Sequence, residues 1–187
     1  NLIGSYVYYR VDADEYFIRE ATLDEVNDWF DDIRPTEPQI PERDLSYTEI
    51  LPLDSIAFDM SSAFGAKCSN VATMRTFGFP AGTIPDGFGV PFYFYDEFMK
   101  YNDFYQVVEA MIVDPDFITD IDIRINMLDD LRDDIRDAPM PQWMLDELQV
   151  MHETWPDSTS IRCRSSTNNE DLPGFSGAGL YTSKTQH

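Results

Sequence analysis

The first part of the chain combines two short apolar segments with one helical repeat. Val7–Val11 is rich in β-branched and aromatic residues, which predicts a strand, and Glu15–Arg19 can pair with it as a hairpin. Thr22 and Glu25 have the spacing of a capping box, which marks the start of a helix. The apolar residues that follow recur at helical spacing: Leu23, Val26, Trp29, Phe30 and Ile33. The pattern therefore predicts a small β–β–α unit.

Residues 34–54 interrupt this regular pattern. They contain four prolines and few periodically spaced apolar residues. Because proline disfavours a helical conformation in the residue before it, we expect an extended connector here. We place a domain boundary in this segment, with residues 1–50 as an N-terminal appendage and connector and residues 51–187 as the main domain.

The main domain is predicted to be mostly helical, with short strands between the helices. Apolar spacing predicts helices over residues 62–76, 95–111, 121–136 and 141–151, and strands over residues 88–92 and 160–164. Four apolar residues of the third helix fall on one face: Ile125, Leu128, Leu131 and Ile135. Pro141 suits the first turn of the fourth helix. The fold class that follows is α+β.

The charge of the chain limits its partners. There are 35 acidic residues against 13 basic ones, which gives a formal net charge of -22. A field of this sign repels polyanions and argues against a nucleic-acid partner. ATP is also an anion, so an ATP site would have to be built from cations placed locally. We interpret the acidity as a contribution to solubility, and an acidic docking face is the less favoured alternative.

The cysteine and histidine content indicates whether a metal site is expected, and the apolar segments indicate where in the cell the protein is expected. The sequence contains no CxxC pair, no HExxH motif and no histidine cluster, so neither a structural zinc nor a histidine-based metal site is predicted. No signal-peptide segment opens the chain, and no apolar run is long enough to span a bilayer. We expect a cytoplasmic protein with reduced thiols, and a Cys68–Cys163 disulfide is the minority alternative.

Lys67 is the first candidate for phosphate binding. Two small residues, Gly65 and Ala66, precede it near a predicted helix start. A helix N-terminus offers free backbone N–H groups and a positive dipole end, and a lysine there adds a point charge. The P-loop pattern is absent, however. On spacing alone, a solvated surface lysine is the commoner case.

A second candidate follows the last predicted strand. Arg162 and Arg164 alternate along that strand and so point to the same face, and arginine suits bidentate recognition of phosphate. The next polar residues supply hydroxyl donors and carboxylates: Ser165, Ser166, Glu170 and Asp171. The carboxylates could orient the arginines or hold Mg²⁺. A surface strand with ordinary ion pairs is the competing interpretation.

The third candidate is the glycine-rich segment 174–183. Gly174, Gly177 and Gly179 alternate with small residues, so the backbone there can approach a ligand closely. A flap over nucleotide phosphates is the functional interpretation. An ordinary flexible loop fits the same pattern.

Taken together and in order, these segments resemble one protein family. Gly65-Ala66-Lys67-x-x-Asn70, followed by Gly78-Phe79-Pro80 and Pro85-Asp86-Gly87-Phe88, resembles the opening of the nucleotide-binding domain of the pyruvate phosphate dikinase and phosphoenolpyruvate synthase family. Arg164-Ser165-Ser166-x-x-x-Glu170-Asp171-Leu172 resembles its later R-S-S segment. The glycine segment Gly177-Ala178-Gly179-Leu180-Tyr181 and the run Val90-Pro91-Phe92 are more similar to the glucan water dikinases. The resemblance covers residues 58–182.

The resemblance implies part of an ATP-grasp-type domain of a dikinase. Lys67 and Arg164 would grip the ATP phosphates as catalytic residues, and Gly177 and Gly179 would cover them. The same implied site includes Ser165, Ser166, Glu170 and Asp171. Asn70 would stabilise the local turn.

In this family, ATP phosphorylates a histidine on a separate domain, which passes the phosphoryl group to pyruvate or a related acceptor. The resemblance places that histidine, the Mg²⁺ ligands and the acceptor site outside this chain, so we expect these 187 residues to be inactive by themselves. Two alternatives stay open. One is a glucan water dikinase-like enzyme, and the other is a nucleotide-sensing or interaction module that has lost catalysis.

Overall fold

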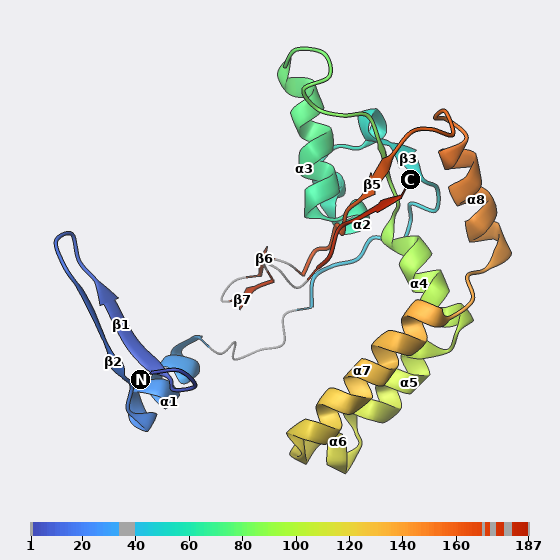
Figure 1. The fold of residues 1–187 in the computed structure, drawn as a ribbon. Coiled ribbons are helices and arrows are strands. Elements are labelled where there is room, and N and C mark those ends of the chain that lie inside the picture. The colour runs from blue at the N-terminus through green and yellow to red at the C-terminus, as the bar shows by residue number, and fades with distance from the viewer. Residues whose placement is uncertain (1, 34–39, 170, 173–174, 178–180, 187) are drawn as a thin grey trace. The chain divides into compact units, whose positions relative to one another are not determined.

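The computed structural model describes residues 2–33, 40–169, 171–172, 175–177 and 181–186. The chain divides into two compact units (Figure 1). The smaller unit comprises residues 1–40 and 170–176, and the larger one comprises residues 41–169 and 177–187. The division after Ile40 falls inside the predicted connector, ten residues before the boundary proposed at residue 50.

The smaller unit has the predicted β–β–α order. Strand β1 (Val7–Val11) pairs with β2 (Tyr16–Glu20) in an antiparallel hairpin, and helix α1 (Leu23–Ile33) follows. The capping box is confirmed at both of its bonds. The Glu25 amide donates to Thr22 Oγ1 over 3.3 Å, and the Thr22 amide donates to a Glu25 carboxylate oxygen over 2.9 Å. A second hairpin in this unit joins β6 (Asp171–Leu172) to β7 (Phe175–Ser176).

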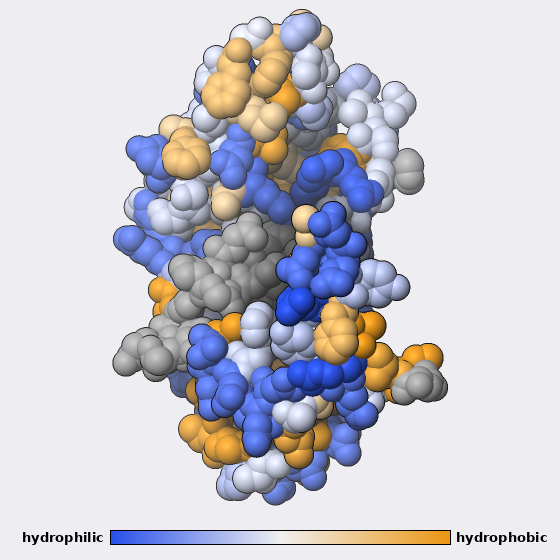
Figure 2. Space-filling view, turned by 90° about the vertical axis from the view of Figure 1, so that its left-hand side faces the viewer, coloured by the Kyte–Doolittle hydropathy of each residue, from blue (hydrophilic) through white to orange (hydrophobic). Residues whose placement is uncertain are grey.

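None of the residues of β1, β2 and α1 is buried. The predicted apolar face of α1 forms, but its side chains are exposed in this unit, Leu23 by 75% and Trp29 by 64%. Local contacts hold the helix to the hairpin, because Arg19 pairs with Glu25 at the start of α1 and the ring of Tyr6 meets that of Phe30. Figure 2 shows hydrophobic residues at the surface among hydrophilic ones.

The larger unit mixes helices with very short strands. Its first half contains β3 (Leu51–Pro52), three 3₁₀ turns η1 (Leu53–Ser55), η2 (Phe58–Met60) and η3 (Arg75–Phe77), the helices α2 (Ser61–Phe64) and α3 (Ala66–Met74), and β4 (Phe88–Gly89). Its second half contains α4 (Phe92–Tyr101), α5 (Phe104–Ile112), α6 (Pro115–Thr119), α7 (Ile121–Asp137), α8 (Gln142–His152), β5 (Ile161–Cys163) and β8 (Lys184–Gln186). Strand β3 pairs antiparallel with β4, and β5 pairs antiparallel with β8. The α+β class is therefore confirmed.

Two groups of buried side chains hold this unit together. The first lies around η1, α2 and α3 and consists of Leu53, Ile56, Ala63, Phe64 and Ala72. The second comes from α4, α5 and α8 and consists of Phe94, Met99, Phe104, Met111 and Met144. Trp143 of α8 meets Phe94 of α4 edge to face, with ring centroids 5.1 Å apart. Burial of apolar surface of this kind is the main favourable contribution to folding.

Two of the helices that were predicted as continuous are each divided into two in the structure. The helix predicted over residues 62–76 is broken at Gly65 into α2 and α3, and Gly65 has a φ of 80°. The helix predicted over residues 95–111 is broken after Tyr101 and resumes at Phe104, with Asp103 in the left-handed region at a φ of 57°. The strand predicted over residues 88–92 is shorter, because Pro91 has no N–H for pairing and instead precedes the first turn of α4.

The other predicted helices of the larger unit are confirmed. Helix α7 covers the predicted range, and its start is capped by Asp120, which accepts from two backbone amides. The predicted apolar face of α7 is confirmed in part: Leu131 and Ile135 are half-buried, whereas Ile125 and Leu128 are exposed. Helix α8 follows Pro141 as predicted. Across the described parts of the chain, no helix is both long and apolar enough to cross a membrane.

Candidate functional site

Gly65 marks the point where two distant segments of the chain touch. Figure 1 shows the chain that follows β5 passing the junction of α2 and α3. A Cβ atom added at Gly65 would overlap the backbone carbonyl and the hydroxyl of Ser166. Gly65 also has a positive φ of 80°, which L side chains rarely adopt. Glycine is therefore required here both by its backbone conformation and by the closeness of Ser166.

The hydroxyl of Ser166 bridges the gap between the two helices. It donates a hydrogen bond to the carbonyl of Phe64 over 2.7 Å and accepts one from the amide of Cys68 over 2.9 Å. The amide of Ala66 donates to the carbonyl of Thr167 over 3.2 Å. The segment 166–167 thus binds backbone groups on both sides of Gly65.

These contacts change the picture of the α3 N-terminus. The first turn of a helix leaves amides without intrahelical partners, and the sequence suggested that they could bind phosphate. In the structure the amides of Ala66 and Cys68 are instead bonded to Thr167 and Ser166. A ligand at this end of α3 would therefore meet side chains rather than a row of open amides.

Lys67 and Arg164 lie on the two segments that meet. Lys67 is the second residue of α3, between the two amides that bond to Ser166 and Thr167, and its side chain is exposed. Arg164 precedes Ser166 by two residues and is also exposed. Because two residues of extended chain span about 7 Å, the backbone of Arg164 is held within that distance of Ser166. The structure therefore brings into contact the two backbone segments that carry the cations which sequence reasoning proposed separately.

The remaining predicted site residues differ in how far they can be placed. Ser165 is half-buried beside Arg164, and Gly177 is buried. Asp171 lies in β6, but its side chain falls outside the described residues, as do Glu170 and Gly179. Asn70, which we expected to stabilise a turn, lies within α3 and is exposed. The guanidinium of Arg162, which was predicted to share a face with Arg164, donates to Thr185 Oγ1 of β8 over 2.8 Å.

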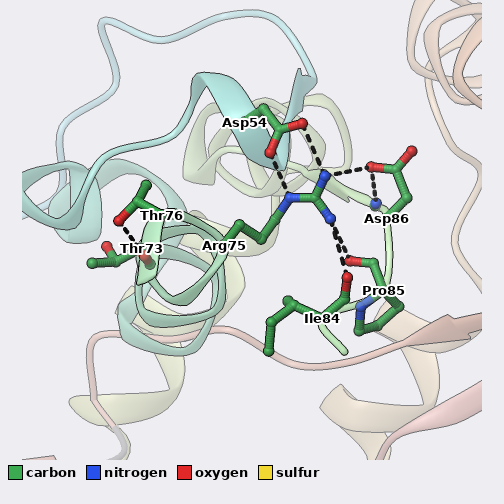
Figure 3. A network of polar contacts seen from close by, with 8 residues as sticks. Asp54, Thr73, Arg75, Thr76, Ile84, Pro85 and Asp86 are labelled. Atoms are coloured by element: carbon green, nitrogen blue, oxygen red, sulfur yellow. Dashed lines mark hydrogen bonds and ion pairs between the residues drawn. The ribbon is translucent and has the colours of Figure 1, made fainter. Parts of the chain in front are cut away.

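Arg75 ties the proline- and glycine-rich loop to the rest of the domain (Figure 3). Its guanidinium pairs with both carboxylate oxygens of Asp54, over 2.5 and 2.9 Å. It also pairs with Asp86 over 3.3 Å and donates to the carbonyls of Ile84 and Pro85. This side chain connects η1 with the end of α3 and with the motif segment 85–88. Sequence reasoning missed it, because an arginine in the last turn of a helix signals no particular partner.

The segment 41–46 contacts both the chain after Ser166 and helix α2. The Asn168 side chain donates to the carbonyl of Glu42 over 2.7 Å, and the amide of Asp44 donates to the carbonyl of Ser62 over 2.9 Å. Arg43, between them, donates to the hydroxyl of Tyr105 over 3.1 Å. Residues 41–46 were predicted to be connector, and they lie in neither a helix nor a strand, but their contacts belong to the larger unit.

Asp96 is a buried charged residue that contacts Tyr105, the partner of Arg43. It is only 4% exposed, accepts a hydrogen bond from Tyr105 over 2.7 Å, and pairs with Lys100 over 2.7 Å. Burial by itself raises the pKa of this carboxyl, but the hydrogen bonds from Lys100 and Tyr105 outweigh it and leave the pKa below its usual value. Asp96 is therefore ionised in the folded protein. Lys100 lies four residues after Asp96 on α4, a spacing at which side chains meet on a helix. Tyr105 lies on α5, beyond a helix break that the sequence did not predict.

The two cysteines are free thiols, so the alternative of a disulfide between them is not realised. Cys68 lies inside α3 next to the site, and burial raises its pKa to about 11. Its thiol is therefore neutral at physiological pH and acts as a small apolar side chain against Gly89. Within the described residues, no group of three or more His, Cys, Asp or Glu side chains is placed to hold a metal ion.

Comparison with known protein families identifies the domain to which this site belongs. Residues 61–185 match the family described as pyruvate phosphate dikinase, AMP/ATP-binding domain. The match includes α3 with Lys67, the loop tied by Arg75 and the segment from Arg164 to Ser166. Since it covers well over half of the chain, the chain belongs to this family. Comparison with curated proteins and with solved structures found no match.

The chain thus contains an ATP-binding domain of dikinase type. This agrees with the resemblance drawn from the sequence motifs. Residues 1–60 lie outside the matched range. Strands β1 and β2 and helix α1 all belong to this unmatched part of the chain.

Proposed function

We propose that this chain supplies the ATP-binding part of a dikinase, in which ATP phosphorylates a histidine on a separate domain for transfer to pyruvate or a related acceptor. The observation that carries the proposal is the contact of the Ser166 segment with the start of α3, because it places Lys67 and Arg164 on adjoining segments. The membership of the chain in the pyruvate phosphate dikinase AMP/ATP-binding family supports it. We further propose that the domain is part of an ATP-grasp-type fold.

In this proposal the chemistry of the site is electrostatic. Transfer of a phosphoryl group spreads negative charge over its oxygens, and cations held in position stabilise that charge. The planar guanidinium of Arg164 suits two phosphate oxygens at once, and Lys67 adds a point charge. Gly177, Gly179, Ser165, Glu170 and Asp171 are proposed to complete the ATP site.

Mg²⁺ is the metal that the proposal implies. Its ligands are proposed to lie outside this chain, as the resemblance to the dikinase family implies. The bound ion would neutralise charge on the phosphates. Lys67 and Arg164 would bind the same phosphates and keep them in a fixed orientation.

A glucan is the second candidate acceptor. The observation that favours it is the sequence of the glycine segment, Gly177-Ala178-Gly179-Leu180-Tyr181, which resembles the glucan water dikinases more than the phosphoenolpyruvate synthases. The helix start at Val90-Pro91-Phe92 has the same similarity. The proposed site for ATP is the same for both acceptors.

The test uses the full-length protein and ATP labelled at the β-phosphate. We expect acid-labile label on the protein, as for phosphohistidine, with release of AMP. Lys67→Ala and Arg164→Ala should each reduce the labelling rate at least about 100-fold, because each removes a charge from the transition state. Matched controls are Lys184→Ala and Arg132→Ala, which remove exposed cations of the same type from β8 and α7 and should leave labelling unchanged.

Two outcomes would contradict the proposal. Absence of label from a wild-type protein that binds ATP would favour a simple γ-phosphoryl kinase or a nucleotide-sensing module. Equal labelling by Arg164→Ala and Arg132→Ala would remove Arg164 from the site. If label is found, adding pyruvate or a soluble glucan then shows which acceptor discharges it.

A further inference from the structure

Ser166 is the side chain that joins the two halves of the proposed ATP site. Its hydroxyl contacts the end of α2 at Phe64 and the first turn of α3 at Cys68, although these residues are 102 and 98 positions away in the sequence. The two bonds span the break at Gly65. One hydroxyl thus fixes the R-S-S segment to both helices.

Neighbouring backbone contacts make this attachment specific. The amide of Ala66 bonds to the carbonyl of Thr167, and the absence of a side chain at Gly65 lets Ser166 lie directly against its Cα. The two bonded amides, those of Ala66 and Cys68, flank Lys67 on either side. The segment that receives them continues through Ser165 to Arg164. This attachment therefore limits how far apart the backbone at Lys67 and the backbone at Arg164 can lie.

The hydrogen-bonding capacity of Ser166 excludes it as a direct phosphate ligand. A serine hydroxyl has a single proton to donate, and here that proton is directed at the Phe64 carbonyl. A phosphate oxygen accepts hydrogen bonds and cannot donate to the hydroxyl. Binding phosphate through Ser166 would break the bond to Phe64.

We propose that Ser166 is a positioning residue, which holds Arg164 at a fixed distance from Lys67 so that both side chains reach the same polyphosphate. The inference rests on the proposed function, since it assigns Lys67 and Arg164 to the ATP site. It goes beyond that function by separating the two serines of the R-S-S segment, with Ser166 acting through other residues.

The test compares two ligands that differ in their number of phosphates. Isothermal titration calorimetry of the full-length protein measures its affinity for ATP and for AMP. Substitution of Ser166 should reduce the affinity for ATP more than the affinity for AMP, because only the longer chain of phosphates needs both cations at a set distance. We expect Ser166→Ala to raise the Kd for ATP about tenfold and the Kd for AMP less than about twofold.

Thr73→Ala is a matched control. The Thr73 hydroxyl is part-buried on the same helix and donates to the carbonyl of Ser69 over 2.7 Å, the same distance as the Ser166 bond to Phe64. Thr73 lies near the far end of α3 from Lys67. This variant should lower the melting temperature by a similar amount and leave the ratio of the two Kd values unchanged.

The outcomes separate positioning from a general structural role. Equal loss of affinity for ATP and AMP in Ser166→Ala, or the same change of ratio in Thr73→Ala, would overturn the proposal. A second measurement covers the case in which Ser166→Ala does not fold. Hydrogen exchange of the wild-type protein without nucleotide should be slow at the Cys68 amide, and exchange there at the rate of an unbonded amide would show that the bridge does not form.

The same experiments distinguish this inference from the proposed function. A wild-type protein that does not bind ATP, but whose Cys68 amide is protected, would contradict the ATP site and leave the bridge as a structural feature. A wild-type protein that binds ATP with an unprotected Cys68 amide would contradict the positioning role alone.

Discussion

At the scale of single residues, the larger unit depends on polar side chains that connect distant segments. Asp96 is nearly buried, and its charge is compensated by Tyr105 and Lys100, with Arg43 at 3.8 Å. Removing one partner from a buried charged group costs more than the bond itself contributes, because the other group is left desolvated. Such residues are therefore the best places to test the arrangement of α4, α5 and the segment 41–46.

Asp96→Asn should lower the free energy of unfolding at pH 7 by about 1–3 kcal/mol, because charge-assisted hydrogen bonds are lost in a buried site. The folded-state pKa of Asp96 lies below its usual value. Its contribution is therefore complete above the unfolded pKa of about 4 and is lost as the pH falls through the folded value. The stability of the variant should consequently decline less than that of the wild type below about pH 4. Urea unfolding at a series of pH values measures both effects.

Asp129→Asn provides the control for Asp96→Asn. Asp129 pairs with Arg132 on the surface of α7, and its side chain is 54% exposed. An exposed pair of this kind contributes about 0–1 kcal/mol. Equal destabilisation by the two substitutions, or an unchanged acid profile in Asp96→Asn, would contradict the role given to Asp96.

At the scale of elements, the break between α2 and α3 is the feature on which the proposed site depends. Helical periodicity runs through residues 62–76 without a stop signal other than Gly65 itself. The break exists because Gly65 adopts a positive φ and because Ser166 occupies the space of a side chain. The N-terminus of α3 then meets the R-S-S segment, which a continuous helix would not allow.

Gly65→Ala should destabilise the protein by about 3 kcal/mol or more, because it adds a left-handed penalty to a steric overlap with Ser166. Gly78→Ala is a matched control, since Gly78 has a φ of 71° and no atom within 4 Å of a built Cβ. Its cost should be only that of the backbone conformation, about 1–2 kcal/mol. Chemical unfolding of both variants gives the comparison. Similar values for the two would show that Ser166 does not press on Gly65.

At the scale of the whole molecule, the dominant property is the charge of -22. Many acidic residues of α7 are exposed, and the ion pairs on that helix, such as Arg136 with Asp133, are exposed too. Self-repulsion of this size opposes the compact state. In the proposed ATP site, Lys67 and Arg164 would act against this general field, and their effect would depend on short distances.

The melting temperature should rise by several degrees between about 10 mM and about 150 mM NaCl, because the Debye length falls from about 30 Å to about 8 Å and screens the repulsion. Choline chloride at equal ionic strength should act in the same way, which distinguishes screening from binding of a particular cation. Calorimetry measures both series. A melting temperature that stays constant or falls with salt would show that attractive ion pairs outweigh the repulsion.

Local signals in the sequence determined the elements that depend on nearby residues. The capping box of Thr22 and Glu25, the hairpin of β1 and β2, and the helices α7 and α8 were predicted because each is stabilised within its own segment. The motifs around Lys67 and Arg164 also pointed to the family, and the match over residues 61–185 agrees with them. These features need no knowledge of distant contacts.

Only the tertiary structure decided how those segments meet. The break at Gly65, the bridge made by Ser166 and the network around Arg75 depend on groups from other parts of the chain. Their energies come from long-range contacts, and hydrophobic periodicity reports only which face of a segment is apolar. The sequence by itself therefore proposed the chemical groups of the site, and the packing of distant segments decided that the segments carrying Lys67 and Arg164 meet.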